Sequence, residues 1–335
     1  MKKYLIIILT FLTAFSFGQN GKENGAQLNL EKKYLQQLER NSISIADTSD
    51  LFMNDGTSKT LFYYALVPRN KIKGVLVMLA GTWEPIEYVI NSNKKLLELA
   101  CDSSLLVIIP SLNNNLYIDN FALNFLNTTF TDVLKKYSPP KNKFVIGGYS
   151  LGGMNSIRYT EMANDSKSTT TIKPLAVYGV DPPLDYVGMY LSFQRTIELN
   201  FSEPAVKEAK DYINKLNTQF GGAPDKNPDK YIQFSMYSRN QKDGGNAKYL
   251  KNVPIRIYSD PDIDWWMKNR HQDYYDMNAV EDAGMINQLN IMGNDKAEFI
   301  NALGKGYRLE GNRHPHSWSI VEPHDCINWI MKLLK

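Results

Sequence analysis

A single serine lies between glycines in the stretch Gly148-Tyr149-Ser150-Leu151-Gly152. An apolar run precedes this stretch, and a segment with helical spacing follows it. The order predicts a strand that turns sharply into a helix, with Ser150 at the turn. A strained backbone there would lift the serine hydroxyl clear of the sheet, where it could act as a nucleophile. The alternative is a glycine-rich turn that happens to contain serine.

A serine hydroxyl is a weak nucleophile until a base removes its proton, and that base is expected to be histidine. The chain has four histidines: His271, His314, His316 and His324. We expect the base on a loop just before the last helix, at the carboxyl edge of the sheet. His316 fits this position best, and His314 is the second candidate. His324 falls in the predicted last helix, and His271 falls in a polar stretch where a surface role is expected.

The histidine needs a carboxylate that fixes its tautomer and stabilises its positive charge. The run PIRIYSDPDIDWW follows an apolar strand and offers Asp260, Asp262 and Asp264. It is not a calcium loop, because the required glycine is absent and His271 stands where a glutamate is needed. Asp262 is preferred, since it lies a little beyond the strand end. Asp181, in YGVDPP, is a further candidate, but a turn-capping role before the prolines is the favoured interpretation.

An oxyanion hole needs two backbone donors. The amide of Leu151 directly follows the nucleophile, and the amide of Thr82 follows the apolar run 74–81, with Trp83 as its alternative. Trp83 is also a candidate substrate contact. Further aromatic residues stand next to the predicted acid and base in sequence, and they either line a pocket or pack the two loops: Trp265, Trp266 and Trp318.

Apolar and β-branched runs alternate with segments of helical period along the chain. Strands are expected at 60–68, 74–81, 105–112, 143–150, 174–180 and 254–260, with a weaker one at 297–302. This alternation predicts an α/β fold with a mostly parallel central sheet and helices on both faces. Active sites in such sheets form at the carboxyl ends of strands, where Ser150 stands.

One interval breaks the alternation. Residues 181–251 contain helical pieces and a glycine-proline stretch but no clear buried strand, which indicates a helical cap over the strand ends. The alternative is a second lobe that serves only packing. Residues 26–40 have helical spacing and predict an N-terminal helix.

Composition restricts the classes of partner. Of 335 residues, 43% are hydrophobic and 22% are charged, which is typical of a globular protein. Residues 1–18 read as a secretory signal peptide, with an apolar run shorter than the roughly 20 residues that span a bilayer. Residues 19–335 would form an exported protein, periplasmic or extracellular, without a stable membrane anchor. No basic stripe favours nucleic acid, and no histidine pattern favours a metal or other cofactor.

The two cysteines are Cys101 and Cys326. Export permits a disulfide between them, but two buried free thiols are the favoured interpretation.

Four motifs together resemble the α/β-hydrolase family, in its exported bacterial, serine-esterase-like form. They are GYSLG, MLAGTW, SDPDID and HPHSWSIV, they span nearly the whole mature chain, and they stand in the order serine, aspartate, histidine. The resemblance implies a hydrolase with a helical cap that cleaves a small-molecule ester or acyl substrate. The loop after residues 74–81 lacks the HGGG signature of many lipases, which leaves the substrate class open. A peptidase or amidase, an acyltransferase, and a non-catalytic exported binding protein are the alternatives.

Overall fold

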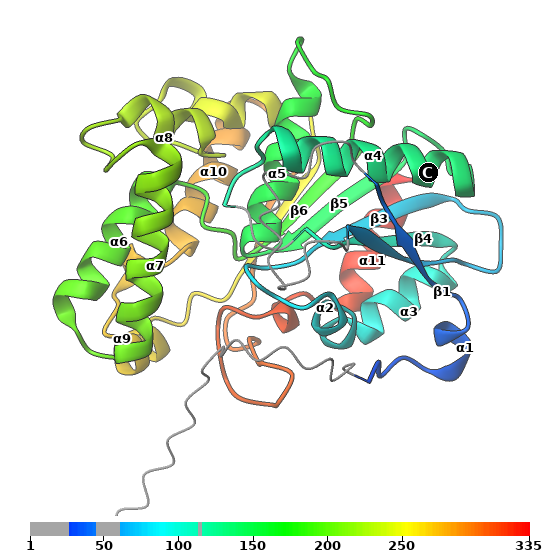
Figure 1. Cartoon of the computed structure of the whole chain (residues 1–335), viewed down its shortest axis with the longest axis horizontal. Coiled ribbons are helices and arrows are strands. Elements are labelled where there is room, and N and C mark those ends of the chain that lie inside the picture. Colours follow the sequence, from blue (N-terminus) through cyan, green and yellow to red (C-terminus); the bar gives the residue numbers. More distant parts are fainter. Residues whose placement is uncertain (1–26, 45–60, 113–115) are drawn as a thin grey trace, which may run out of the picture.

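The fold is built on one eight-stranded sheet. A computed structural model describes residues 27–44, 61–112 and 116–335. The strands lie in the order β1-β2-β4-β3-β5-β6-β7-β8 (Figure 1). Their bounds are β1 Leu38–Ser42, β2 Phe62–Leu66, β3 Gly74–Leu79, β4 Leu105–Pro110, β5 Phe144–Tyr149, β6 Ala176–Val180, β7 Ile255–Ser259 and β8 Ala297–Asn301. All seven predicted strands are confirmed.

The sheet is mostly parallel. Strands β3 to β8 pair in parallel, while β2 pairs antiparallel with both β1 and β4. Every residue of β3, β4, β5, β6 and β7 is buried. Strands covered on both faces are continuous apolar runs, which is why the sequence located them well.

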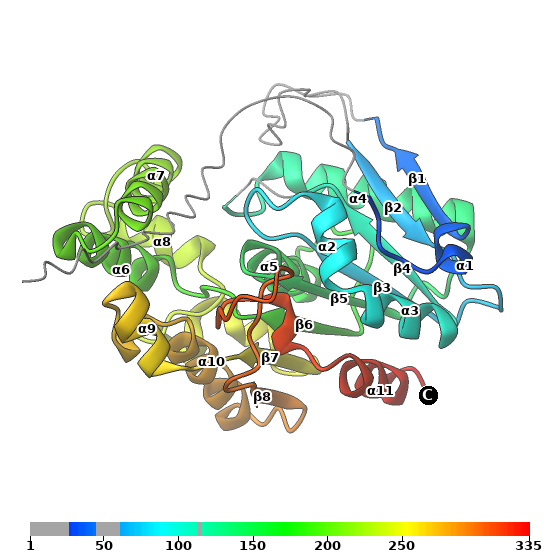
Figure 2. The same ribbon diagram turned by 90° about the horizontal axis from the view of Figure 1, so that it is seen from below.

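Helices cover both faces of the sheet (Figure 2). The longer ones are α3 Lys94–Asp102, α4 Asn120–Tyr137, α5 Leu151–Asn164, α6 Tyr186–Leu199, α7 Glu203–Phe220, α9 Ile263–Arg270, α10 Ala279–Ile291 and α11 Pro323–Leu333. The shorter α-helices are α1 Lys32–Leu35, α2 Ile86–Ser92 and α8 Pro228–Phe234. The 3₁₀ helices are η1 Lys242–Leu250, η2 Tyr274–Asp276 and η3 Trp318–Ile320.

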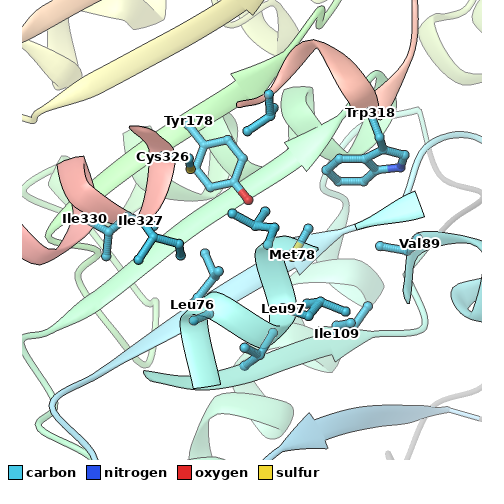
Figure 3. Packing of buried hydrophobic residues seen from close by; sticks show 14 of the residues in the cluster. Leu76, Met78, Val89, Leu97, Ile109, Tyr178, Trp318, Cys326, Ile327 and Ile330 are labelled. Carbon is cyan, nitrogen blue, oxygen red and sulfur yellow. The ribbon is translucent and has the colours of Figure 1, made fainter. Parts of the chain in front are cut away.

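Side chains alternate between two cores because successive strand residues point to opposite faces. Leu76 and Met78 of β3 pack with α2, α3 and α11, as Figure 3 shows for Leu97 and Ile330. The intervening residues of β3 pack with α4 on the other face.

The interval between β6 and β7 is helical. It contains α6, α7, α8 and η1, which lie beside the sheet at the left of Figure 1. Helices α6 and α7 pack against each other, and their apolar side chains join one cluster with residues of α5 and α10. This cluster anchors the helices beyond the carboxyl ends of the strands.

The N-terminal prediction was wrong in part. The helix expected over residues 26–40 covers only Lys32–Leu35, and β1 follows at Leu38. Pairing with β2 outweighs the weak helical period of this segment. The proposed signal peptide, residues 1–18, lies outside the described residues.

Cys101 and Cys326 are both buried free thiols, which confirms the favoured interpretation. Among the described helices, none combines the length and apolar character that a membrane crossing requires.

Candidate active site

Ser150 occupies a strained turn between β5 and α5. Its backbone has φ 51° and ψ −119°, a left-handed φ that is uncommon for a residue with a side chain. The Ser150 amide donates to the Val180 carbonyl of the neighbouring strand at 2.9 Å. The turn between strand and helix predicted from the sequence is therefore present, with the serine at its centre.

The glycines around Ser150 are required by close backbone approach. A Cβ on Gly148 would lie 2.3 Å from the backbone of Gly152, and a Cβ on Gly152 would lie 2.1 Å from the Leu79 carbonyl oxygen. A Cβ on Gly147 would overlap the ring of Tyr178. Helix α5 can thus approach β5 and β3, and β5 can lie beside the Tyr178 ring of β6, only if these positions lack side chains.

His316 pairs with Asp181 rather than with Asp262. The His316 Nδ1 lies 2.6 Å from Asp181 Oδ2. The preference for Asp262 as the carboxylate partner of the histidine was therefore wrong. Asp181 directly follows β6, the neighbour of the serine-bearing strand β5, so it stands at the same sheet edge as Ser150.

Asp181 is held in place by two further side chains. The Ser259 hydroxyl donates to Asp181 Oδ1 at 2.8 Å, and Asn278 Nδ2 lies 3.3 Å from Oδ2 and donates to the Asp181 carbonyl at 2.9 Å. The backbone φ of Asp181 is 48°. These hydrogen bonds orient the Asp181 carboxylate toward His316. The sequence around Asp181, a turn before two prolines, does not predict them.

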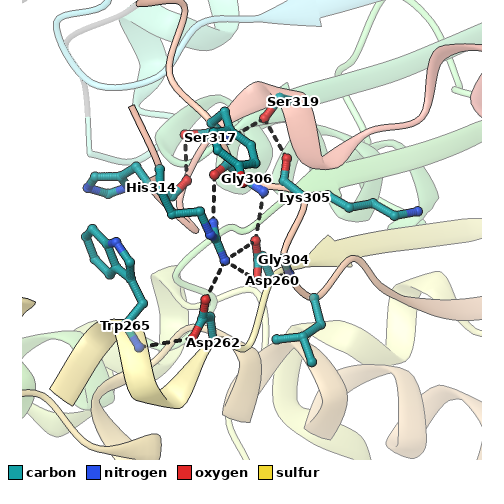
Figure 4. A network of polar contacts seen from close by, with 12 residues as sticks. Asp260, Asp262, Trp265, Gly304, Lys305, Gly306, His314, Ser317 and Ser319 are labelled. Atoms are coloured by element: carbon teal, nitrogen blue, oxygen red, sulfur yellow. Dashed lines mark hydrogen bonds and ion pairs between the residues drawn. The ribbon is translucent and has the colours of Figure 1, made fainter. Parts of the chain in front are cut away.

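The aspartates after β7 stabilise a loop instead (Figure 4). Asp260, fully buried, accepts the amides of Gly304 and Gly306 and pairs with Arg313 at 2.8 Å. Asp262 accepts from Arg313 at 2.7 Å and caps the first turn of α9 at Trp265. Both carboxylates therefore anchor the 302–317 loop, which carries His316.

His314 is a neighbour of the site and not the partner of Asp181. Its ring lies 4.7 Å from that of Trp265 and 6.0 Å from that of Trp266. Burial and the positive charges of Arg308, His316 and Arg270 lower the His314 pKa to about 2, so this ring is neutral at ordinary pH. Its ring nitrogen Nδ1 lies 3.5 Å from Arg308 Nη2.

The other two histidines lie apart from this arrangement. His271 is exposed at the end of α9, stacked on Phe201 at 3.6 Å, as the expected surface role implies. His324 is in the first turn of α11.

Ser150 and His316 open into one cavity of about 230 Å³. Thr82 and Leu151, the predicted oxyanion donors, also line it. Leu151 is the first residue of α5, and the first amides of a helix have no partner within the helix. Helices α6 and α7 contribute Met189, Phe193, Ala205 and Tyr212 to the wall, and the segment 266–281 lines the cavity as well.

The three predicted tryptophan contacts do not line this cavity within the described residues. Trp318 is buried, and its Nε1 donates to the Glu84 carboxylate, so of the two alternatives it packs the loop and does not contact the cavity. Trp265 packs on His314, and Trp83 packs against Tyr212 of α7. Trp266 does line the cavity, from the same sequence run.

A second carboxyl group lies near Asp181. Asp282 of α10 is fully buried, and neither of its oxygens has a hydrogen-bond partner among the described residues. Burial, together with the charges of Asp181 and Glu281, raises the Asp282 pKa well above its ordinary value. Burial therefore disfavours a charge on Asp282, whereas it is the Asp181 carboxyl group that contacts His316.

No group of three or more histidine, cysteine or acidic side chains in the described part of the chain is placed to hold a metal ion. The chemistry available at this site is that of a serine hydroxyl, an imidazole and a carboxylate.

Comparison with solved structures identifies the fold. MPT51 of Mycobacterium tuberculosis is similar over 89% of this chain and 97% of its own, with 11% identity and a TM-score of 0.54. Carboxyl esterase 2 of Tuber melanosporum is similar over 96% and 91%, with 14% identity and a TM-score of 0.54. The chain has the α/β-hydrolase fold.

An S-formylglutathione hydrolase of Agrobacterium tumefaciens is similar over 89% of this chain and 95% of its own, with 11% identity and a TM-score of 0.50. No protein-family model and no curated protein matches the sequence. The likeness therefore lies in the fold.

Proposed function

We propose that this protein is a serine hydrolase that cleaves a carboxylic ester through an acyl-enzyme intermediate. The observation that carries the proposal is the 2.6 Å contact between His316 Nδ1 and Asp181, with His316 and the strained Ser150 lining the same cavity. A nucleophile, a base and an orienting acid on one sheet edge are the parts that acyl transfer requires.

In the proposed first step, Ser150 Oγ attacks the ester carbonyl while His316 takes its proton. Asp181 holds the imidazole in the tautomer that has its proton on Nδ1 and stabilises the imidazolium that forms. The amides of Leu151 and Thr82 donate to the developing oxyanion. His316 then gives its proton to the leaving alkoxide, and the alcohol departs.

In the second step, His316 removes a proton from water, which attacks the acyl-enzyme carbonyl. The acid product leaves and Ser150 recovers its proton. Several proteins of similar structure are esterases or hydrolases, which supports ester cleavage as the reaction. The apolar wall from α6 and α7 suits a small organic group.

We also propose that the protein acts after export, in the periplasm or outside the cell. This part rests on the charged, apolar and small-residue pattern of residues 1–18.

The test is hydrolysis of short-chain p-nitrophenyl esters by the mature protein, beside Ser150→Ala and His316→Ala. Loss of either residue should lower kcat by a factor on the order of 10⁶, which amounts to background. His271→Ala, at the exposed end of α9, is the matched histidine control and should keep wild-type turnover. Turnover that survives in Ser150→Ala would contradict the proposal.

A further inference from the structure

Two arginines line the cavity without an acidic partner. Arg270, at the end of α9, and Arg308, in the 302–317 loop, both contribute to the cavity wall. Within the described residues, neither forms an ion pair with a carboxylate, although Arg195, Arg256 and Arg313 all do. A half-buried guanidinium without an anion is costly unless a ligand supplies one.

Arg308 lies close to the reacting groups. Its Nη1 donates to the Tyr149 hydroxyl at 3.0 Å, and its guanidinium carbon is 5.9 Å from the Tyr149 ring centre. The Tyr149 ring lies 4.6 Å from the His316 ring, and Tyr149 directly precedes Ser150. One aromatic ring therefore separates the Arg308 charge from the proposed base.

The groups around Arg308 do not neutralise it. Tyr149 and His314, its two hydrogen-bond neighbours, are both uncharged at neutral pH, since burial raises the Tyr149 pKa and lowers that of His314. Glu84 is the nearby carboxyl group, but it already accepts from the Gly81 amide and Trp318 Nε1. Burial raises the Glu84 pKa to about 7, so its negative charge is incomplete at neutral pH.

Four acids line the cavity, and within the described residues none of them forms an ion pair with Arg270 or Arg308. Asp276 pairs with Arg195 at 3.1 Å, and Asp185 caps α6 through the Val187 amide. Burial raises the pKa of Glu281, at the start of α10. Glu208 comes from α7. The guanidinium of Arg308 lies 3.5 Å from His314 Nδ1, at the end of the cavity that also holds His316.

We propose that Arg308, assisted by Arg270, binds a carboxylate of the substrate close to the scissile ester. This inference rests on the proposed function and names its substrate class: esters that carry a free carboxylate on either the acyl or the alcohol side. The guanidinium fork matches the two oxygens of a carboxylate, and partial burial strengthens their attraction.

Two matched ester pairs test this. Mono-4-nitrophenyl adipate and its methyl ester differ only in a carboxylate on the acyl side. 4-Carboxyphenyl acetate and its methyl ester differ only in a carboxylate on the alcohol side. The quantity compared is the ratio of kcat/KM for the charged ester to that for its neutral partner.

The wild type should favour the charged ester of at least one pair by about tenfold or more, since hydrogen bonds to charged groups contribute that much. Arg308→Gln should lower this ratio at least tenfold, and Arg308→Lys should retain part of it. Because Arg308 also donates to Tyr149, Arg270→Gln supplies a second variant, one without a hydrogen bond to lose in the described structure, and it should also lower the ratio. Arg40→Gln, on exposed β1 at the far edge of the sheet, makes the same charge change and should leave the ratio unchanged.

A wild type that hydrolyses the neutral esters as fast as the charged ones would overturn the inference and leave the proposed function standing. A charge preference that persists in both Arg308→Gln and Arg270→Gln would also overturn it. Absence of all turnover, together with absence of covalent labelling of Ser150 by a fluorophosphonate, would instead contradict the proposed function, and the inference would fall with it.

Discussion

At the residue scale, the site depends on which carboxylate orients His316. The contact at 2.6 Å assigns this position to Asp181, which Ser259 and Asn278 hold from two sides. Asp262 is occupied by Arg313 and by the first turn of α9. Substitution of Asp181 should therefore lower turnover far more than substitution of Asp262.

Asp181→Asn should lower kcat by about 10⁴, because an amide can no longer fix the tautomer or stabilise the imidazolium. Asp262→Asn removes the same charge from a capping position and should keep kcat within about tenfold of wild type. Steady-state hydrolysis of a p-nitrophenyl ester measures both. The reverse order, with Asp262→Asn the slower variant, would show that the Asp181 contact does not serve catalysis.

The sequence alone predicts the nucleophile and the base of the site but not the acid. Ser150 and His316 were predictable because a glycine-flanked serine and a histidine before the last helix have local signals. The acid had no such signal. The three aspartates after β7 matched the pattern expected for the acid, whereas Asp181 resembled a turn cap. What distinguishes Asp181 is its contact with Ser259 and Asn278, which lie far from it in the sequence.

At the element scale, the Asp260 network holds the loop that carries the base. Asp260 accepts two loop amides and pairs with Arg313, whose Nη1 also donates to the Gly306 carbonyl at 2.6 Å. The loop between β8 and α11 is thus tied to the end of β7 (Figure 4).

Asp260→Asn should lower the free energy of unfolding by about 3 kcal/mol, since it removes a buried carboxylate that accepts the Gly304 and Gly306 amides and is one of the two carboxylate partners of Arg313. It should also lower kcat, because His316 lies on the same loop. The matched control is Asp264→Asn, an exposed position in the first turn of α9, with an expected change below about 0.5 kcal/mol. Denaturant unfolding compares the two, and equal effects would argue against the anchoring role.

A second prediction concerns the junction of β5 and α5 and its effect on stability. Gly152→Ala should destabilise the fold by about 3 kcal/mol or more, because its Cβ would lie 2.1 Å from the Leu79 carbonyl oxygen. In Gly188→Ala, within α6, the new Cβ meets only Asp185 at 3.9 Å, and the change should raise the free energy of unfolding by up to about 1 kcal/mol. Thermal unfolding of the pair would refute this account if Gly152→Ala matched the wild type.

Strands with a continuous apolar sequence could be predicted from the sequence. A strand that forms only because it pairs with a neighbouring strand could not. Strands β3, β4, β5, β6 and β7 are buried on both faces and were all predicted. Strand β1 is a short edge strand with the sequence Leu-Glu-Arg-Asn-Ser, and only its pairing with β2 makes it a strand. The helical interval after β6 was visible because it interrupts the alternation of strands and helices.

At the scale of the whole molecule, three buried carboxyl groups make stability depend on pH. Glu84, Glu161 and Asp282 are each nine-tenths or more buried. Burial raises the pKa of Glu84 to about 7 and that of Glu161 to about 8, and it raises that of Asp282 well above its ordinary value. In the folded protein these groups keep protons that the unfolded chain releases.

The free energy of unfolding should therefore fall as pH rises from about 4.5, where the unfolded glutamates ionise, through about 8. Glu161→Gln removes one such group and should flatten the decline by an amount on the order of a few kcal/mol. Urea unfolding at pH 5, 6.5 and 8 measures the slope, with the exposed Glu310→Gln as the control of equal charge change. A stability that rises over this range would show that the three carboxyl groups are ionised in the fold.

Covalent labelling tests most directly whether Ser150 is a nucleophile. The protein would be treated with a fluorophosphonate and digested, and the modified residue would be located by mass spectrometry. We predict one adduct, on the peptide that contains Ser150, with no adduct in Ser150→Ala and slow labelling in His316→Ala and Asp181→Asn. Labelling of another residue, or equal labelling in Ser150→Ala, would contradict the account and reduce the Gly148–Gly152 stretch to a glycine-rich turn.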